Sequence, residues 1–251
     1  MTARAGRAGR REGRPGASRF AAASLAAFAA VLISTAARAE VGAVASIYSD
    51  DRFRGVSVSD GRPVGILDLS YDAANGLYAA ASGSVVATRG DGLKPLGLVL
   101  NGGYAERFRS GLNGDVGVVY SHYSHYSGVS SGRDYTEIYA GLIGKILGAR
   151  LSVSPNYLGF ARWTVRAEVS GHVDLARTLY VDGELGALTA LGHSASQGKY
   201  KTIVDARIGV ARSTGPVTLH AAATVRSGSA AIYGLRERRH AGLIIGISSA
   251  F

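Results

Sequence analysis

The sequence contains no cysteine, and this absence removes several classes of chemistry at once. The protein can form no disulfide, use no thiol nucleophile and offer no cysteine ligand to a metal. Beyond residue 39 there is no apolar run long enough for a membrane-spanning helix and no stretch with helical periodicity. A phosphate-binding loop, a dinucleotide fingerprint and an EF-hand pattern are also missing. We therefore expect no cofactor.

The N-terminal segment has the three parts of a secretory signal peptide. Six arginines before residue 20 face a single acid, and an uncharged apolar run follows over 20–37. An Ala-Arg-Ala motif ends at Ala39, which predicts cleavage between Ala39 and Glu40. The alternative is an uncleaved anchor, because the run approaches the roughly 20 residues of a spanning helix. We favour a signal peptide over 1–39, used by the general secretory pathway, followed by one domain over 40–251.

Removal of this segment changes the electrostatic argument. The whole chain has 28 basic and 18 acidic residues, of which residues 1–39 hold seven and one. The remaining chain therefore carries 21 basic and 17 acidic side chains, a net charge of +4 instead of +10. The basic balance lies mostly in the signal segment, so it gives no reason to expect a nucleic-acid partner.

The domain alternates between apolar and polar residues with the period of a β-strand. The clearest segment is 163–175, where seven apolar or small residues alternate with six polar ones. The same pattern occurs at 112–120, 150–157, 179–189 and 204–210, and more weakly at 41–49, 62–71, 77–86, 96–106, 135–145 and 216–225. A strand with one apolar and one polar face fits a membrane barrel, which has lipid outside and water inside.

Short and long connections alternate between these segments. Short turns are expected near 72–76, 107–111, 147–149, 176–177 and 213–215, and longer links near 50–61, 88–95, 124–134, 155–162, 191–199 and 227–239. Bacterial outer-membrane barrels have this parity, with short periplasmic turns and long extracellular loops. A soluble β-sandwich, which is the alternative fold, has no reason to show it.

The C-terminal segment 240–251 is one more alternating strand and ends on Phe251. In an outer-membrane barrel the last strand closes the sheet and its terminal aromatic residue lies in the interfacial girdle. Such a strand also resembles the signal read by the outer-membrane insertion machinery. We therefore predict an all-β, antiparallel, up-and-down transmembrane barrel of about twelve strands, within about 10–14, in the outer membrane.

A series of motifs resembles the TorF family of porins. The motifs span 49–63, 75–79, 114–118, 134–139 and 154–159, and they follow the order of that family within roughly residues 40–190. Two positions depart from the family: Asp51 stands where it usually has Tyr, and 81–84 lacks the expected Trp. These departures affect the girdle and the pore lining, not the fold. The resemblance implies an outer-membrane porin and names no substrate.

Charged residues on the polar strand faces are candidates for the pore lining, because a wet lumen tolerates them. They are Arg150, Arg166, Glu168, His172, Asp174, Asp182, Glu184, Asp205 and Arg207. Four further residues flank the first long loop: Arg52, Arg54, Asp60 and Arg62. The second group forms either a charged constriction or a salt-bridged loop that packs into the mouth. Twelve strands enclose less space than the 16–18 of general porins, so a narrow or obstructed pore is expected.

The repeat over 121–127, which contains His122 and His125, is the only enzyme-like feature of the sequence. A Ser-His pair needs an orienting group and an oxyanion donor, and neither is found at a diagnostic spacing. We find no convincing carboxylate partner for a metal at these histidines either. We therefore expect no catalytic residue and no metal site.

Together these features predict a passive channel for small hydrophilic solutes or ions. A structural or adhesive barrel without conductance is the first alternative, and a barrel enzyme is the second. The expected partners are outer-membrane lipids and lipopolysaccharide, with the insertion machinery and periplasmic chaperones during assembly. The sequence leaves the oligomeric state open.

Overall fold

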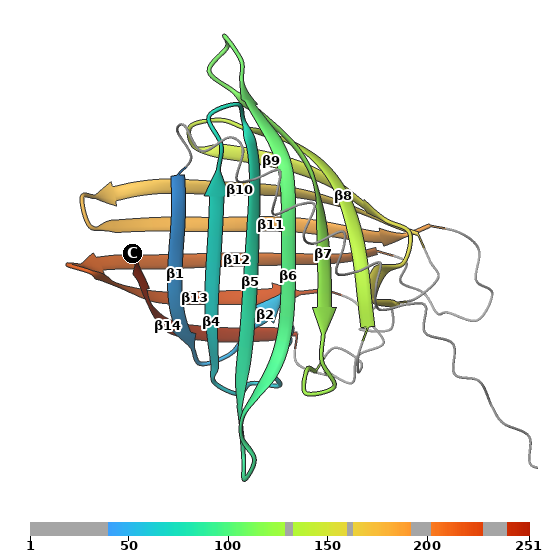
Figure 1. Ribbon diagram of the computed structural model, residues 1–251, viewed down its shortest axis with the longest axis vertical. Coiled ribbons are helices and arrows are strands. Elements are labelled where there is room, and N and C mark those ends of the chain that lie inside the picture. The colour runs from blue at the N-terminus through green and yellow to red at the C-terminus, as the bar shows by residue number, and fades with distance from the viewer. Residues whose placement is uncertain (1–39, 129–132, 160–162, 192–201, 228–239) are drawn as a thin grey trace, which may run out of the picture. The chain divides into compact units, whose positions relative to one another are not determined.

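Twelve antiparallel strands of the computed structural model form a closed barrel (Figure 1). The structure describes residues 40–128, 133–159, 163–191, 202–227 and 240–251. The barrel strands are β1 (Glu40–Tyr48), β4 (Val64–Asp72), β5 (Leu77–Thr88), β6 (Gly92–Arg107), β7 (Asn113–Tyr123), β8 (Arg133–Ile143), β9 (Leu147–Ser154), β10 (Thr164–Ala176), β11 (Leu179–Ala190), β12 (Thr202–Thr214), β13 (Val217–Arg226) and β14 (Ala241–Ala250). Each strand pairs with its neighbour along the chain, and β1 also pairs with β14. The predicted all-β, up-and-down fold is confirmed.

The outward face of the barrel is apolar. On β14, for example, Leu243, Ile245 and Ile247 are exposed, whereas Ile244 between them is buried. Large aliphatic side chains are exposed at alternate positions of β12 as well, and others are exposed on β10 and β11. Exposure of so much apolar surface to water would cost free energy, whereas contact with lipid would not. With the closed sheet, this face establishes an outer-membrane barrel. No helix in the described ranges has the length and apolar character needed to cross a membrane.

The C-terminal strand closes the barrel as predicted. Ser46 pairs with Ser248 in the β1–β14 ladder. At its end, the Phe251 amide donates to the Ala43 carbonyl at 3.0 Å, and the Ala43 amide donates to the Phe251 carbonyl at 3.2 Å. The Phe251 side chain is exposed. Its role as an insertion signal stays a prediction, and so does cleavage after Ala39, which lies outside the described residues.

Three local predictions were wrong. The long link expected at 88–95 is a tight turn of three residues, because Gly90 and Gly92 adopt positive φ angles of 95° and 72° that permit sharp reversal. Pro95 lies within β6 next to a β-bulge at Ser84 and Val85, where a missing N–H is tolerated.

The other two corrections concern β9. The turn expected at 147–149 lies at 144–146, and the Gly144 amide donates to the Leu147 carbonyl at 2.8 Å. At the other end, β9 stops at Ser154 instead of continuing to Tyr157. Pro155 cannot donate to the ladder, and a short 3-10 helix, η1 (Tyr157–Gly159), follows it.

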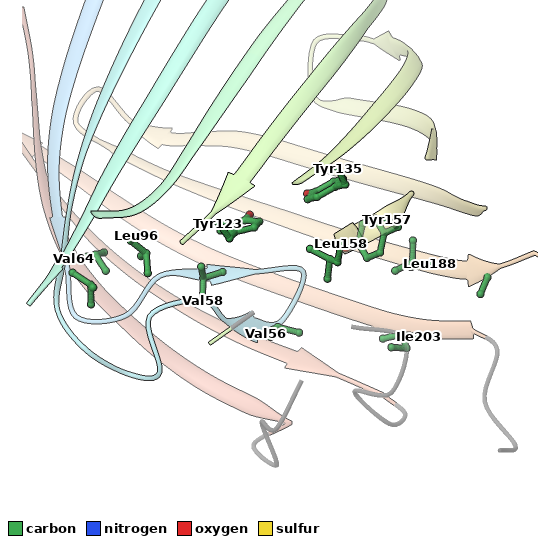
Figure 2. Packing of buried hydrophobic residues seen from close by; sticks show 12 residues of the cluster. Val56, Val58, Val64, Leu96, Tyr123, Tyr135, Tyr157, Leu158, Leu188 and Ile203 are labelled. Atoms are coloured by element: carbon green, nitrogen blue, oxygen red, sulfur yellow. The ribbon is translucent and has the colours of Figure 1, made fainter. Parts of the chain in front are cut away.

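The first long connection folds into the barrel. It contains the hairpin β2 (Arg52–Phe53) and β3 (Val56–Ser57), and we call residues 50–61 the plug hairpin. The plug hairpin packs with η1 against the inner ends of the strands in one buried apolar cluster (Figure 2). The cluster comprises Val56, Val58, Val64, Val86, Leu96, Tyr123, Tyr135, Tyr157, Leu158, Leu188, Ala190 and Ile203. The buried apolar core therefore lies inside the barrel, at the end that carries the plug hairpin, which we call the loop end.

Candidate pore and its plug

The plug hairpin is organised around the buried carboxylate of Asp50. Its Oδ1 accepts hydrogen bonds from the hydroxyls of Ser57 at 2.5 Å and Ser59 at 2.8 Å. Its Oδ2 accepts from Arg52 at 3.0 Å. Two serines at alternate positions, with Gly55 and Gly61 at positive φ, thus let a short polar segment satisfy its own buried groups.

One ion pair joins the plug hairpin to the barrel wall. Arg54 donates to both carboxylate oxygens of Glu137 on β8, at 3.0 and 2.8 Å, and the two side chains are 8% and 6% exposed. The Arg54 guanidinium also lies over the Tyr157 ring, 5.3 Å from its centroid. Burial acts against the charged form of Arg54, but Tyr157 and Glu137 outweigh it and hold the Arg54 pKa well above its ordinary value. The pair therefore stays charged and bidentate.

The tip of the plug hairpin reaches the opposite wall. A Cβ built on Gly55 would lie 2.9 Å from the Arg226 Cβ and 3.4 Å from the Asp205 Cβ. A Cβ on Gly242 of β14 would lie 2.6 Å from the Arg52 guanidinium. The hairpin thus crosses the lumen and contacts β8, β12, β13 and β14.

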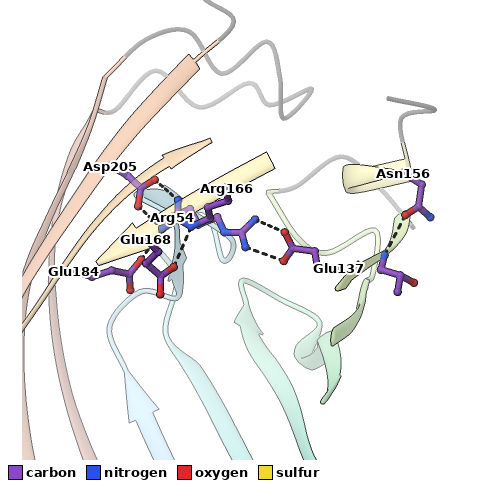
Figure 3. A network of polar contacts seen from close by, with 8 residues as sticks. Arg54, Glu137, Asn156, Arg166, Glu168, Glu184 and Asp205 are labelled. Atoms are coloured by element: carbon purple, nitrogen blue, oxygen red, sulfur yellow. Dashed lines mark hydrogen bonds and ion pairs between the residues drawn. The ribbon is translucent and has the colours of Figure 1, made fainter. Parts of the chain in front are cut away.

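A second network surrounds Arg166 on β10 (Figure 3). Its Nη1 and Nη2 donate to the two oxygens of Asp205 at 2.6 and 3.0 Å. Its Nε donates to Glu168 at 3.0 Å, and Nη2 also donates to Glu184 at 2.6 Å. Arg166 is almost completely buried, and its single positive charge pairs with three carboxylates at this point of the wall. This network carries an excess of negative charge.

Below the plug hairpin lies a polar cavity of about 270 Å³. Among the described residues lining it are four arginines and four acids: Arg52, Arg54, Arg150, Arg207, Glu137, Glu168, Glu184 and Asp205. Tyrosine rings and the hydroxyls of Ser121, Ser152 and Thr224 complete the wall. A lumen lined this way offers many hydrogen-bonding partners to water, in contrast to the apolar cluster at the loop end.

The structure brings six of the nine predicted pore residues to this cavity or its wall. Arg150, Glu168, Glu184, Asp205 and Arg207 line it, and Arg166 lies behind it. Of the other three, Asp182 pairs with Arg207, while His172 and Asp174 pair with each other at 3.2 Å nearer the turn end and do not line it.

The four residues of the first loop divide into two pairs. Arg52 and Arg54 lie inside the barrel, as described above. Arg62 donates to the carbonyls of Ser59 at 2.7 Å and Tyr126 at 2.6 Å, and its ion pair with Asp60 is a looser 3.6 Å. The inner pair thus fixes the plug, and the outer pair fixes the loop above it.

Sequence reasoning missed three acids of the lumen. Glu137 holds Arg54, Asp50 holds the plug hairpin, and Asp115 accepts from Arg150 at 3.1 Å. Glu137 alternates with the exposed Ile138 within 135–145, so strand parity alone could have placed it inside. No local signal indicates that its partner is 83 residues away.

Asp51 is a second residue of the plug hairpin whose pKa departs from its ordinary value. Burial, with the neighbouring charges of Asp50 and Asp68, raises the pKa of Asp51 to about 6. The docked plug hairpin therefore favours the protonated form of this carboxyl.

The histidine repeat requires one correction, because His122 does have a carboxylate partner. Its Nδ1 lies 2.5 Å from Asp134 Oδ1, and Tyr120 donates to the other Asp134 oxygen at 2.7 Å. Ser124 donates to the Pro95 carbonyl at 2.6 Å and not to a histidine of the repeat. Within the described residues no group of three or more His, Asp or Glu side chains is arranged for a metal.

Comparisons with known proteins agree with this geometry. A family model described as "bacterial protein of unknown function (Gcw_chp)" matches residues 34–241. No curated protein matches the chain. The NanC porin aligns with a TM-score of 0.53 and 11% identity over 84% of this chain and 99% of its own. A protein from a study of in-meso crystallization of membrane proteins aligns at 0.51 and 9%, over 84% of this chain and 83% of its own. At these identities the likeness shows the fold.

Proposed function

This chain belongs to the Gcw_chp family of bacterial proteins, and from its geometry we propose that it is a narrow outer-membrane channel for passive diffusion of small hydrophilic solutes or ions. Solutes follow their gradient, and selectivity comes from the charges of the lumen and from the docked plug hairpin. The proposal assigns no catalytic residue and no cofactor. The resemblance to TorF-type porins and the fold shared with the NanC porin support it.

The observation that carries the proposal is the charged cavity within the closed barrel. A barrel serving only as a scaffold can fill its interior with packed side chains. Here apolar packing is concentrated at the loop end, and four arginines and four acids surround about 270 Å³ of open space below it. Maintaining paired charges around a wet cavity is what an ion or solute path requires.

The plug hairpin makes this a restricted channel. Its ion pair to Glu137 and its contacts with β12, β13 and β14 place it across the lumen. We expect small unitary currents, with transitions between levels when the plug hairpin moves.

Assembly follows from the predicted signals at the two ends. Cleavage between Ala39 and Glu40 releases the barrel domain to the periplasm, where chaperones carry it to the insertion machinery that reads the strand ending at Phe251. Lipopolysaccharide and outer-membrane lipid then cover the apolar face.

Single-channel recording in a planar bilayer tests the proposal. The wild-type protein should give discrete steps, and Glu168→Gln should lower the cation-to-anion permeability ratio measured from the reversal potential in a KCl gradient. Val169→Ala is the matched control, because the next residue on β10 faces outward and should leave that ratio unchanged. A folded, heat-modifiable barrel without steps would reject the channel and favour the structural or adhesive role.

A further inference from the structure

Two opposite charges face each other across β11 and β12 without pairing. Glu184 and Arg207 are direct register partners. Glu184 nevertheless accepts from Arg166 at 2.6 Å, and Arg207 donates to Asp182 instead. Both side chains line the cavity and are about one-third exposed. Each retains hydrogen-bonding capacity directed at the same space.

Glu168 is a second carboxylate on the Glu184 side of the cavity. It and Glu184 share the single guanidinium of Arg166, and each gives it one oxygen. The second oxygen of each carboxylate accepts no hydrogen bond from the residues that the structure describes. Their side chains are 24% and 33% exposed toward the cavity. A pair of carboxylates in this state suits an ammonium group, which has three donors.

Thr224 is the independent observation that points to a ligand. It is directly opposite Arg207 on the β12–β13 ladder and lines the same cavity. The residue is 5% exposed, and its buried Oγ1 has no hydrogen-bond partner among the residues that the structure describes. Buried hydroxyls normally have a hydrogen-bond partner. An unpartnered hydroxyl beside Arg207, which retains hydrogen-bonding capacity, therefore indicates that a ligand supplies the partner.

We propose that this cavity binds a small zwitterion of the α-amino-acid type. The ammonium group lies between Glu168 and Glu184, and the carboxylate accepts from Arg207 and the Thr224 hydroxyl. The equal numbers of arginines and acids in the lining favour a solute carrying both charges over a net cation or anion. The inference names the solute class of the proposed channel, and so it rests on the proposed function.

Isothermal titration calorimetry of the full-length gene product, purified from outer membranes in detergent, tests the site. The probes are L-serine, ethanolamine, which has only the amine, and glycerate, which has only the carboxylate. L-serine should bind at least about tenfold more tightly than either, because each loses one charge-assisted contact. Equal binding of ethanolamine and serine, or no heat with any probe, would overturn the proposal.

Two substitutions locate the binding. Glu184→Gln, which can still accept from Arg166, and Thr224→Val should each weaken serine binding by about tenfold. His172→Gln should not, because His172 pairs with Asp174 outside the cavity. Unchanged serine affinity in Glu184→Gln would refute the site. Conduction without serine binding would support the proposed channel and refute the proposed site. Serine binding without conduction would support the site and refute the channel.

Discussion

At the scale of single residues, the interior of this barrel depends on charges that are satisfied by partners far away in the sequence. Arg54 and Glu137 are separated by 83 residues, and Arg166 and Asp205 by 39. A buried charge that loses its partner is costly, whereas loss of both partners is often tolerated. The pairs can therefore be tested one member at a time.

The first prediction concerns the Arg54–Glu137 pair. Arg54→Ala should lower the free energy of unfolding by about 1–3 kcal/mol, because it leaves the buried Glu137 carboxylate without its donors. Urea unfolding followed by heat-modified mobility measures this change. The double variant Arg54→Ala, Glu137→Ala should recover part of the loss, and strictly additive costs would contradict the coupling.

Tyrosine–glycine contacts across neighbouring strands are a second residue-scale feature. Tyr78 lies against Gly103, and Tyr139 lies against Gly117, each glycine being the register partner of its tyrosine. The two tyrosine hydroxyls hydrogen-bond to each other. The rings occupy the space where a side chain would stand, so the glycines are required by packing.

The second prediction follows from this contact. Gly103→Ala should destabilise the barrel by about 1–3 kcal/mol, because its Cβ would lie 2.5 Å from both the Tyr78 hydroxyl and the Val116 carbonyl. Gly83→Ala is the matched control: a Cβ there meets nothing within 4 Å, so the change should stay within about 0.5 kcal/mol. Equal unfolding midpoints for the two variants would show that the contact does not constrain the strand.

At the scale of elements, the plug hairpin is a separate piece of structure docked inside the barrel. It pairs only within itself as a sheet. Among its attachments to the barrel are the Arg54 ion pair, the Val56 and Val58 contacts and backbone bonds such as Gly128 N–H to the Val58 carbonyl at 2.7 Å. An element outside the barrel sheet can shift without unfolding the barrel.

The third prediction is a pH dependence of plug docking. Because docking raises the Asp51 pKa from 3.8 to about 6, the protonated form docks more favourably. Docking should therefore be strongest below about pH 4 and weaken as the pH rises through about 6. Single-channel recording between pH 4 and 7 should show an increasing fraction of open time.

Two substitutions isolate the responsible group. Asp51→Asn should abolish the pH dependence and keep the plug docked at neutral pH. Asp60→Asn is the control, because Asp60 belongs to the same loop but its side chain is 61% exposed. A pH response that survives in Asp51→Asn would assign the titration to another group.

At the scale of the whole molecule, closure of the sheet is what permits the membrane to surround it. A closed barrel leaves no strand edge with unpaired backbone groups in lipid. Here the last residue takes part: both backbone groups of Phe251 pair with Ala43, and its ring remains exposed.

The fourth prediction separates the part that Phe251 takes in closing the barrel from its recognition by the insertion machinery. Phe251→Ala keeps the backbone pair with Ala43, so the stability of the refolded barrel should change by less than about 1 kcal/mol. Assembly in cells should fall, measured as the heat-modifiable fraction in outer membranes, while Phe251→Tyr should assemble normally. Normal assembly of Phe251→Ala would remove the insertion role assigned to this residue.

The alternation of apolar and polar residues was sufficient to predict the strands, their lipid and lumen faces and the closing strand, because a strand exposes successive residues to opposite sides. It also placed Arg166, Glu168, Glu184 and Asp205 inside. The tight turn at Gly90 was missed because the sequence places Pro95 as the last residue of a long link before a strand at 96–106, whereas a bulge accommodates it within β6.

Only the tertiary structure decided what the lumen contains. Strand parity specifies a side and carries no information on depth, on the partner across the lumen or on the path of a loop. The inward fold of residues 50–61, the pairing of Arg54 with Glu137 and the open space between Glu184, Arg207 and Thr224 all depend on closure of the sheet. Closure places strands from distant parts of the chain around one polar lumen. Their charged side chains come within pairing distance only in that arrangement.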